Sequence, residues 1–346
     1  MNGARIRTII GLELTQRVRS STWYILLGVC AVILLAVTVL SFSVWSSADD
    51  RGVGVYSTVV FMALLLAVLV SPTLSGNAIN GDRDAATLAP VQVTLATTGE
   101  ILLGKFLAAW LTGLAFVVVA VPFMLIATFG GGISPLVVIV SLVILIAEIG
   151  VIAAIGVGLS GILAKPIFSV AVTYLVVAAL VVGTLIAFGL GGSAVRSEAT
   201  QQYRYYVYDN QGNFDPDECG EWEVSTYEMP RFDYVWWMLA ANPFVILADA
   251  TPTTFNAYGY PNDLFGQIKF GVRAAQVAPD LEQTWDECST VREPEGPTPE
   301  EIIASTTPSW FVGLGLQVLL AAGLLWWAWA RTRTPARRLP PGTRIA

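Results

Sequence analysis

The feature that most constrains this chain is a series of long apolar runs separated by short polar breaks. A helix needs roughly 20 apolar residues to cross a hydrocarbon core about 30 Å thick. Inside lipid every backbone N–H and C=O group must be paired within the protein, so continuous apolar runs of this length must be helical. Only 13% of the residues are charged, against roughly a quarter in ordinary globular domains. The sequence therefore predicts an all-α integral membrane protein.

Six runs are long enough to span a membrane, and we expect transmembrane helices at Trp23–Trp45, Val55–Leu74, Phe106–Phe129, Ile133–Leu163, Ile167–Leu190 and Trp310–Ala330. A cleaved signal peptide is the competing interpretation of the N-terminus. The apolar run after Trp23 is longer than the 7–15 residues of a signal h-region, which favours a retained helix. The predicted organisation is residues 1–22 on the membrane surface, 23–190 as helices one to five, 191–308 as an outer region, 309–330 as the sixth helix and 331–346 as a basic tail.

Basic residues predict the orientation. They gather before the first span and after the last, and cytoplasmic flanks of membrane proteins carry an excess of Lys and Arg. Six spans place both ends on one side, so we expect both termini in the cytoplasm of a cell membrane. The first 22 residues, with Ile6, Ile9, Ile10, Leu14 and Val18 at helical spacing, predict either an amphipathic elbow helix on the membrane or a basic topogenic leader.

The region between the fifth and sixth spans differs in composition from the rest. Residues 191–308 hold 19 acidic and 6 basic residues, a net charge of −13. Such a surface has little affinity for nucleic acid, and no nucleic-acid module is visible. Cys219 and Cys288 lie there, and an oxidising outer compartment permits a disulfide between them; two free thiols are the alternative. The apolar stretch Val235–Ala248 is too short to span, so we expect an interfacial or re-entrant element, or a core helix of the outer domain.

The residues needed for catalysis are missing. The chain has no histidine, which removes Ser–His and Cys–His nucleophile pairs and most zinc and haem sites. Gly99–Lys105 matches seven positions of a phosphate-binding P-loop, but Phe106 stands where the motif needs Ser or Thr, and no buried strand precedes it. We therefore expect no enzyme active site and no cofactor in this chain, and we interpret Lys105 as a snorkelling anchor at the membrane surface.

Glu148 is the only carboxylate deep within a predicted span. Ionisable residues are costly in lipid and by default face the bundle interior or a water-filled path. A proton relay or substrate contact is one interpretation, and a protonated glutamic acid hydrogen-bonded to a neighbouring helix is the other. Small residues follow it at Gly150, Gly156, Gly158 and Gly161, and these permit close helix packing.

Several short motifs, taken in order, resemble the permease subunit of ABC transporters of the type 2 exporter class. The stretch Asn80–Leu88 holds an acidic–basic–acidic cluster followed by Thr-Leu, and Glu100–Lys105 then enters the third span. Ile155–Ser160 and Ala241–Phe244 are also similar to family features. The sequence departs from the family pattern at Asp82 and Asp84, where glutamates are usual, and at Ala86 and Leu95.

The resemblance implies a function. The chain would form half of a translocation path, pair with an identical or related second permease in the lipid bilayer, and dock a separate ATP-binding cassette ATPase that binds ATP and Mg²⁺. The N-terminal helix and the cytoplasmic segment within residues 75–105 would contact that ATPase. The candidate coupling residues are Asp82, Arg83, Asp84, Thr87, Leu88, Glu13 and Arg17.

Two other functions are compatible with the residues. A secondary transporter would use Glu148, although it normally needs charged or discontinuous helices and inverted repeats. A non-transporting membrane anchor or sensor would bind a ligand through the outer region. The sequence does not identify a transported substrate.

Overall fold

The computed structural model of the chain describes residues 2–48, 50–86, 96–208, 214–289 and 296–333. Within these ranges six helices are long and apolar enough to cross a membrane, which makes the chain a multi-pass membrane protein. They are α2 (Ser21–Val44), α3 (Arg51–Ser75), α6 (Thr98–Thr128), α7 (Pro135–Ile162), the continuous helix α8–η1–α9 (Pro166–Ala178, Ala179–Gly183 and Thr184–Ala194) and α13 (Trp310–Thr332).

Local sequence signals fix the ends of two of these helices. At α6 the Thr97 side chain accepts from the Glu100 N–H, and the Glu100 carboxylate accepts from the Thr97 N–H, which is a complete capping box. At α7 the Ser134 side chain caps the Leu136 N–H, and Pro135 occupies the first helical position. The predicted third span begins at Phe106, so the structure extends it by two turns of polar and mixed sequence.

Helices α3 and α7 form the centre of the bundle. Their most apolar windows are 67% and 56% buried inside the protein, against 11% for α8–η1–α9. Glycines let α7 approach its neighbours closely: a Cβ on Gly158 would lie 2.8 Å from Leu324 of α13, and one on Gly161 would lie 2.5 Å from Ala328. The prediction that the small residues of this span permit close packing is therefore confirmed.

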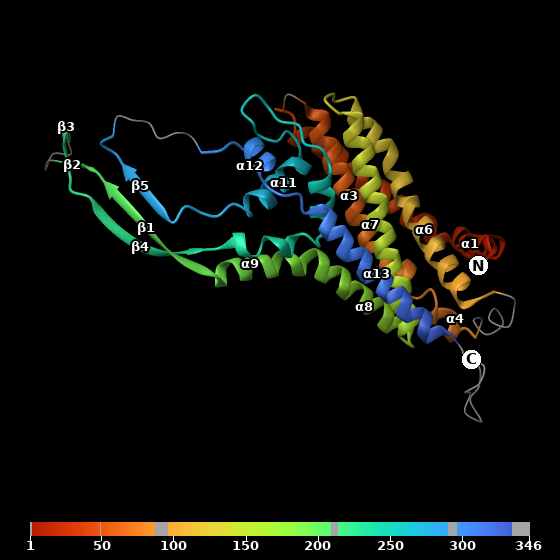
Figure 1. Cartoon of the computed structure of the whole chain (residues 1–346). Helices are drawn as coiled ribbons and strands as arrows, with labels where there is room; N and C mark the ends of the chain where they lie inside the picture. Colours follow the sequence, from red (N-terminus) through yellow and green to blue (C-terminus); the bar gives the residue numbers. More distant parts are fainter. Residues whose placement is uncertain (1, 49, 87–95, 209–213, 290–295, 334–346) are drawn as a thin grey trace.

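The helix α8–η1–α9 bends away from the bundle (Figure 1). Its middle, Ala179–Gly183, is π-helical, and a π-helical turn alters the hydrogen-bond ladder and allows a bend. The side chain of Asn242 donates to the Val181 carbonyl at 2.8 Å and to the Thr184 hydroxyl at 3.0 Å. A residue distant in sequence thus satisfies the polar groups at the bend.

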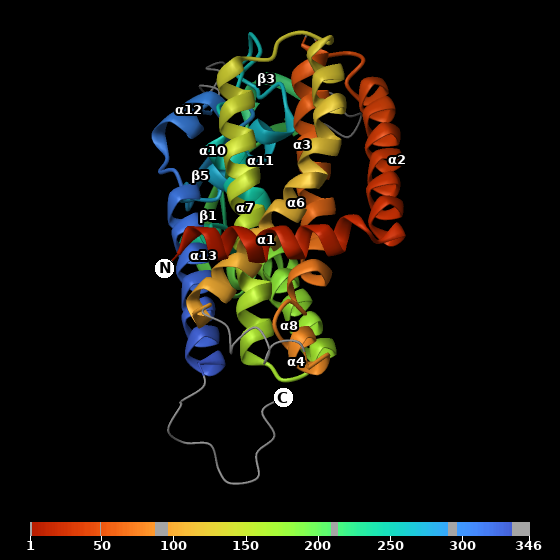
Figure 2. The same cartoon turned by 90° about the vertical axis from the view of Figure 1, so that its right-hand side faces the viewer.

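Helix α1 (Gly3–Val18) lies across the bundle, and α2 stands at its edge (Figure 2). A short helix, α4 (Asn80–Asp84), follows α3 at the same end as α1. We call this end of the molecule the α1 end and the opposite end the arm end.

An extended arm projects from the far end of α9 (Figure 1). Its sheet has the order β4–β1–β5: β1 (Arg196–Arg204) pairs antiparallel with β4 (Glu223–Pro230) and parallel with β5 (Glu282–Asp286). A second pair, β2 (Tyr206–Tyr208) and β3 (Phe214–Cys219), forms its tip.

The all-α prediction is therefore wrong for the arm. Strand sequences are recognised by alternation of apolar and polar residues, which reflects one buried face. The first four residues of β5 are exposed without interruption, and so are those of β4, with Val224 at 62%. This sheet has no continuous buried face, so its strands leave no alternating pattern in the sequence.

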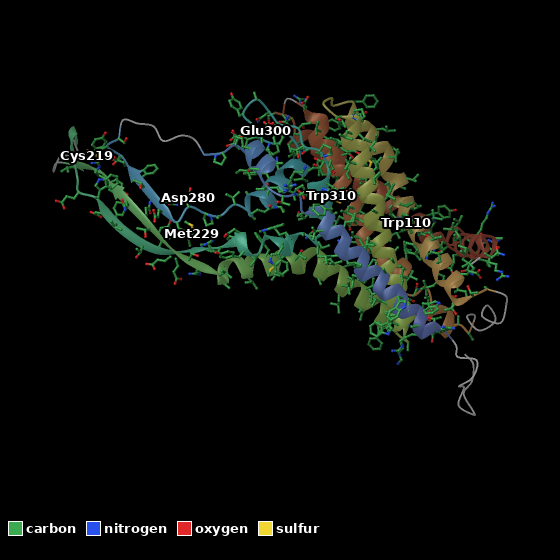
Figure 3. The ribbon with its side chains drawn as sticks, viewed as in Figure 1. Trp110, Cys219, Met229, Asp280, Glu300 and Trp310 are labelled. Carbon is green, nitrogen blue, oxygen red and sulfur yellow. A yellow bond between two sulfur atoms is a disulfide. The ribbon has the colours of Figure 1, made fainter. Side chains whose placement is uncertain are left out.

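The predicted disulfide between Cys219 and Cys288 is confirmed. Figure 3 places Cys219 at the far end of the arm, well away from Trp310 at the start of α13. The bond joins the end of β3 to the segment after β5 and closes a separation of 69 residues. The chain-entropy estimate for such a loop is about 4 kcal/mol. The third cysteine, Cys30, is free and buried in α2.

Replacing both Cys219 and Cys288 with serine is expected to loosen the arm. The disulfide closes a loop that also contains residues 243–274, whose helices pack into the bundle core. Its loss therefore removes up to about 4 kcal/mol from the folding of the whole loop. Limited proteolysis should cut the arm at least tenfold faster, and the thermal midpoint of the helical signal should fall. A Cys30→Ala control should keep the wild-type shift in gel mobility on reduction. Equal cutting rates would show that the bond contributes nothing to the arm.

The apolar stretch Val235–Ala248 forms a short 3-10 helix and a buried α-helix rather than a span. Helix η3 (Trp236–Leu239) leads into α10 (Pro243–Ala250), in which Ile246, Leu247 and Ala248 are all 0% exposed. Asn242 caps α10 by accepting from the Phe244 N–H. Phe61 of α3 stacks on Phe244 of α10 and packs against Phe265 of α11 (Leu264–Ala274). The stretch thus ends in a buried helix that packs against the helix bundle.

Candidate functional site

A buried ionic cluster joins α1, α4 and α6 at the α1 end. Lys105 lies two turns inside α6, and its ammonium group is 2.5 Å from the Glu13 carboxylate of α1 and 2.7 Å from the Asp82 carboxylate of α4. The Lys105 side chain is only 5% exposed, and the two carboxylates are 20% and 34% exposed. We call these three residues the Lys105 brace. The Lys105 ammonium group therefore does not extend into solvent as a snorkelling side chain would, because α1 crosses over it and supplies a carboxylate.

Gly104 allows α1 to lie this close to α6. A Cβ at Gly104 would lie 2.8 Å from a side-chain carbon of Ile9, a separation that real side chains do not adopt. A second acid fixes the start of α1: Glu100, 1% exposed, accepts from the Asn2 N–H at 2.6 Å and pairs with Arg5 at 3.6 Å. The first turns of α6 therefore hold α1 at both its beginning and its middle.

Arg17 fixes the other end of α1 to α3. Its Nη2 donates to the Leu74 carbonyl at 2.6 Å, close to the last residue of α3. Its Nη1 is buried and has no hydrogen-bond partner within the described ranges. Burial lowers the pKa of Arg17, and the neighbouring Glu13 opposes that shift. The guanidinium remains charged, because an arginine pKa lies far above neutrality.

Helix α4 is tied to two other spans. The Ser160 hydroxyl of α7 accepts from the Ile79 N–H at 2.9 Å and donates to the Asn80 side-chain oxygen at 3.0 Å, and both Ser160 and Asn80 are 0% exposed. Arg83 donates to the Thr332 hydroxyl of α13 at 3.0 Å. With the Lys105 brace, these contacts connect α4 to α1, α6, α7 and α13.

The structure thus brings four of the seven predicted coupling residues to one place. Glu13, Arg17, Asp82 and Arg83 all face contacts inside the protein at the α1 end, while Asp84 is exposed at the end of α4. Thr87 and Leu88 lie outside the described residues. The sequence does not identify Lys105 as the partner of Glu13 and Asp82, or Ser160 as the residue that holds the start of α4. Both lie within stretches that resemble family motifs.

Glu148 lies at the middle of α7 and is 0% exposed. Neither of its carboxyl oxygens has a hydrogen-bond partner among the residues that the structure describes. The side chain of Gln317 on α13 lies beside it; Gln317 Nε2 donates to the Ala241 carbonyl at 2.9 Å, and its Oε1 is also unpartnered within that set. An ionised carboxylate buried without donors is very costly, whereas a protonated one offers a donor to Gln317 Oε1. This geometry fits the interpretation as a neutral glutamic acid bonded to a neighbouring helix.

A second buried polar cluster fastens α10, α11 and α13 at the arm end. Asp249 of α10 is 0% exposed at its side chain and pairs with Arg273 of α11 at 2.7 Å. Its other oxygen accepts from the backbone N–H groups of Ser309 and Trp310 at 2.7 and 3.0 Å. Asp249 therefore caps the positive N-terminal end of α13. No local sequence signal shows this cap, because its donor and acceptor are 60 residues apart.

Asp263, the buried N-cap of α11, is expected to make the stability of the protein depend on pH. Burial raises its pKa to about 6, although the Gly266 N–H and the nearby Lys269 oppose the shift. Because the pKa of Asp263 is higher in the folded state than in the unfolded state, protonation of this carboxyl group stabilises the folded protein. That stabilisation is present below about pH 4 and is lost as the pH rises through about 6.

An Asp263→Asn variant keeps the side-chain oxygen that caps Gly266 and removes the buried charge. Relative to wild type, we expect its thermal midpoint to rise between pH 4 and pH 7. The exposed Asp280→Asn variant is the control and should track wild type. A difference in midpoint between Asp263→Asn and wild type that stays constant with pH would contradict the assignment.

No protein-family model and no curated protein matches this chain. In the part of the chain that the structure describes, no group of three or more His, Cys, Asp or Glu side chains is placed to hold a metal ion.

Proposed function

We propose that this chain is the membrane-spanning permease subunit of an ATP-driven exporter of the ABC type 2 class. It forms half of the translocation path, pairs with a second permease and depends on a separate ATPase subunit. The proposal places the α1 end in the cytoplasm, because the basic flanks of the first and last spans lie at that end. The disulfide-linked arm then lies on the oxidising side.

The Lys105 brace is the observation that carries the proposal. An exporter without its own ATPase needs elements that transmit a movement from a soluble partner to the spanning helices. Helices α1 and α4 lie at the predicted cytoplasmic end and are joined to α6 through Lys105, to α7 through Ser160 and to α13 through Thr332. A displacement of α1 or α4 is therefore transmitted to three spans, as rigid elements with discrete contacts allow.

This geometry divides the coupling residues into two roles. Glu13, Arg17, Asp82 and Arg83 make contacts within the chain, so we propose that they transmit the movement. The exposed Asp84 at the end of α4 is proposed to touch the ATPase. The ATPase itself is proposed from the resemblance to the permease family.

The test is purification of the tagged chain from its source membranes, followed by assay of ATP hydrolysis. A soluble ATPase should be recovered with the wild-type chain, and Asp84→Arg should lower the recovered activity at least tenfold. Glu300→Arg, an exposed charge reversal on α12 (Pro299–Ser305) at the arm end, is the matched control and should have no effect. Recovery of no ATPase would refute the proposed function, whereas equal recovery with Asp84→Arg would refute only the contact site.

A further inference from the structure

The arm has an open strand edge along β4. In the order β4–β1–β5, and within the part of the chain that the structure describes, β4 pairs with β1 alone. It is eight residues long, against five for β5 at the other edge. Six of its residues are exposed and the other two are half-buried. An edge strand presents backbone N–H and C=O groups with which another extended chain is able to pair.

The register shows which backbone groups of β4 point away from the sheet. The Arg231 N–H donates to the Val195 carbonyl at 2.8 Å, next to the first pair of strand partners in the β1–β4 ladder. Hydrogen-bonded pairs recur at every second residue of an antiparallel ladder. Thr200, which stands opposite Thr226, accordingly donates its N–H to the Leu281 carbonyl on the β5 side at 2.7 Å. The β4 residues whose N–H and C=O groups both point outward are therefore Val224, Thr226 and Glu228.

The two faces of the sheet differ in chemistry beside this edge. On one face Glu228 stands directly opposite Glu198, and both side chains are exposed. Arg196 lies on that face too and pairs with Glu228 at 3.2 Å. On the other face Tyr227 and Met229 (Figure 3) are half-buried. A strand added at β4 would therefore meet carboxylates on one face and apolar side chains on the other.

The charge of the arm selects the kind of chain that pairs there. Residues 196–230 and 280–289 contain 12 acidic and 2 basic residues, and both bases already form ion pairs, Arg196 with Glu228 and Arg204 with Asp286. Acidic side chains on an edge strand prevent the pairing of two like edges, so a second copy of this arm is excluded. Like charges directly opposite each other also destabilise a strand pair, and a cation beside Glu198 and Glu228 would relieve that repulsion.

We propose that the β4 edge binds an extended segment of another polypeptide in which basic and apolar residues alternate. The segment adds to the sheet as a fourth strand and pairs its backbone with Thr226 and the outward residues on either side. Its basic side chains lie on the face of Glu198 and Glu228, and its apolar side chains lie beside Tyr227 and Met229. In strand addition, main-chain hydrogen bonds provide affinity and alternate side chains provide specificity. The inference rests on the arm alone and is independent of the proposed transport function.

The experiment measures binding of a fluorescent peptide of about ten residues, alternating lysine and valine with blocked ends, to the full chain in detergent. A strand length of this kind matches the β4 edge. Wild type should bind this peptide at least tenfold more tightly than two control peptides. The first control replaces lysine with glutamate. The second keeps lysine and valine but carries methyl groups on its central backbone nitrogens, which leaves the charge unchanged and removes the N–H donors.

Two matched proline variants locate the edge. Thr226→Pro removes an outward N–H at the middle of β4, where proline is tolerated because no bond to β1 is lost, and should weaken binding at least tenfold. Thr284→Pro makes the same change on β5, whose Leu281 carbonyl and Glu287 N–H bond toward β1 and leave Thr284 outward; it should bind as wild type. Retention of the Cys219–Cys288 disulfide, seen as a shift in gel mobility on reduction, checks that the arm of each variant folds.

A charge variant tests the acidic face. Glu198→Gln should weaken binding about two- to fivefold, as expected for an exposed ion pair, without speeding proteolysis of the arm, since it removes a repulsion. Glu300→Gln, an exposed substitution on α12, is the control. The proposal is overturned if wild type does not bind the lysine–valine peptide, or binds the methylated peptide equally well. It is also overturned if Thr226→Pro binds as wild type, because the contact would then be charge attraction without strand addition.

Discussion

Replacing Lys105 with methionine is expected to destabilise the protein strongly and to release α1 from the bundle. The substitution removes the ammonium group that pairs with both Glu13 and Asp82 and leaves their carboxylates facing each other over a side-chain position that is 5% exposed. Removing one partner of a buried ion pair costs about 3–5 kcal/mol. We expect the lower end of that range, since Asp82 is 34% exposed and water screens it.

The measurement is the thermal midpoint in detergent together with hydrogen exchange of the α1 backbone. Lys105→Met should lower the midpoint and speed exchange in α1 more than in α7. Adding Glu13→Gln and Asp82→Asn to the same chain should recover most of the stability, because the two side chains that face position 105 then carry no charge. The exposed Lys165→Met is the matched control. If Lys105→Met behaves like Lys165→Met, the brace contributes no stability.

Replacing Gly313 with alanine is expected to disrupt the packing between α13 and the segment before α10. A Cβ at Gly313 would lie 1.7 Å from the Ala240 carbonyl oxygen and 2.6 Å from its carbon. These are backbone atoms, so no change of side-chain rotamer relieves the contact. Overpacking of this kind typically costs about 1–3 kcal/mol, and occasionally more. Displacement of α13 should also break the hydrogen bond that Gln317, one turn further along the helix, donates to the Ala241 carbonyl.

Gly315 provides the control for this substitution. It lies in the same helix, and a Cβ there would have no heavy atom within 4 Å. Alanine is a better helix former than glycine by about 1 kcal/mol, so Gly315→Ala should hold or raise the thermal midpoint. Gly313→Ala makes the same change in helix propensity and should still lower the thermal midpoint by several degrees. Equal midpoints for the two variants would show that the backbone at Ala240 moves aside without loss of stability.

Some parts of the candidate site can be found from the sequence, and other parts are visible only in the structure. Asp82 and Arg83 stand out because they resemble a charged family motif, and both lie at the α1 end in contact with other helices. The sequence does not show that Lys105 is buried, because its burial depends on α1 crossing it, and Glu13 is 92 residues away from it in sequence. Gln317 is not recognisable as a partner of Glu148, since a neutral amide in an apolar run has no periodic signature.

The sequence by itself determined the six spans and favoured the disulfide without excluding free thiols. Long apolar runs have only one stable conformation in a bilayer, whereas the pairing of Cys219 with Cys288 depends on the tertiary structure that brings them together. Tertiary structure alone decided the rest: the exposed sheet of the arm, whose strands carry no alternating pattern, the burial of Lys105 and the cap that Asp249 places on α13. Each of these features depends on contacts between groups that are far apart in the chain. Local propensity and hydrophobic periodicity carry no information about such contacts.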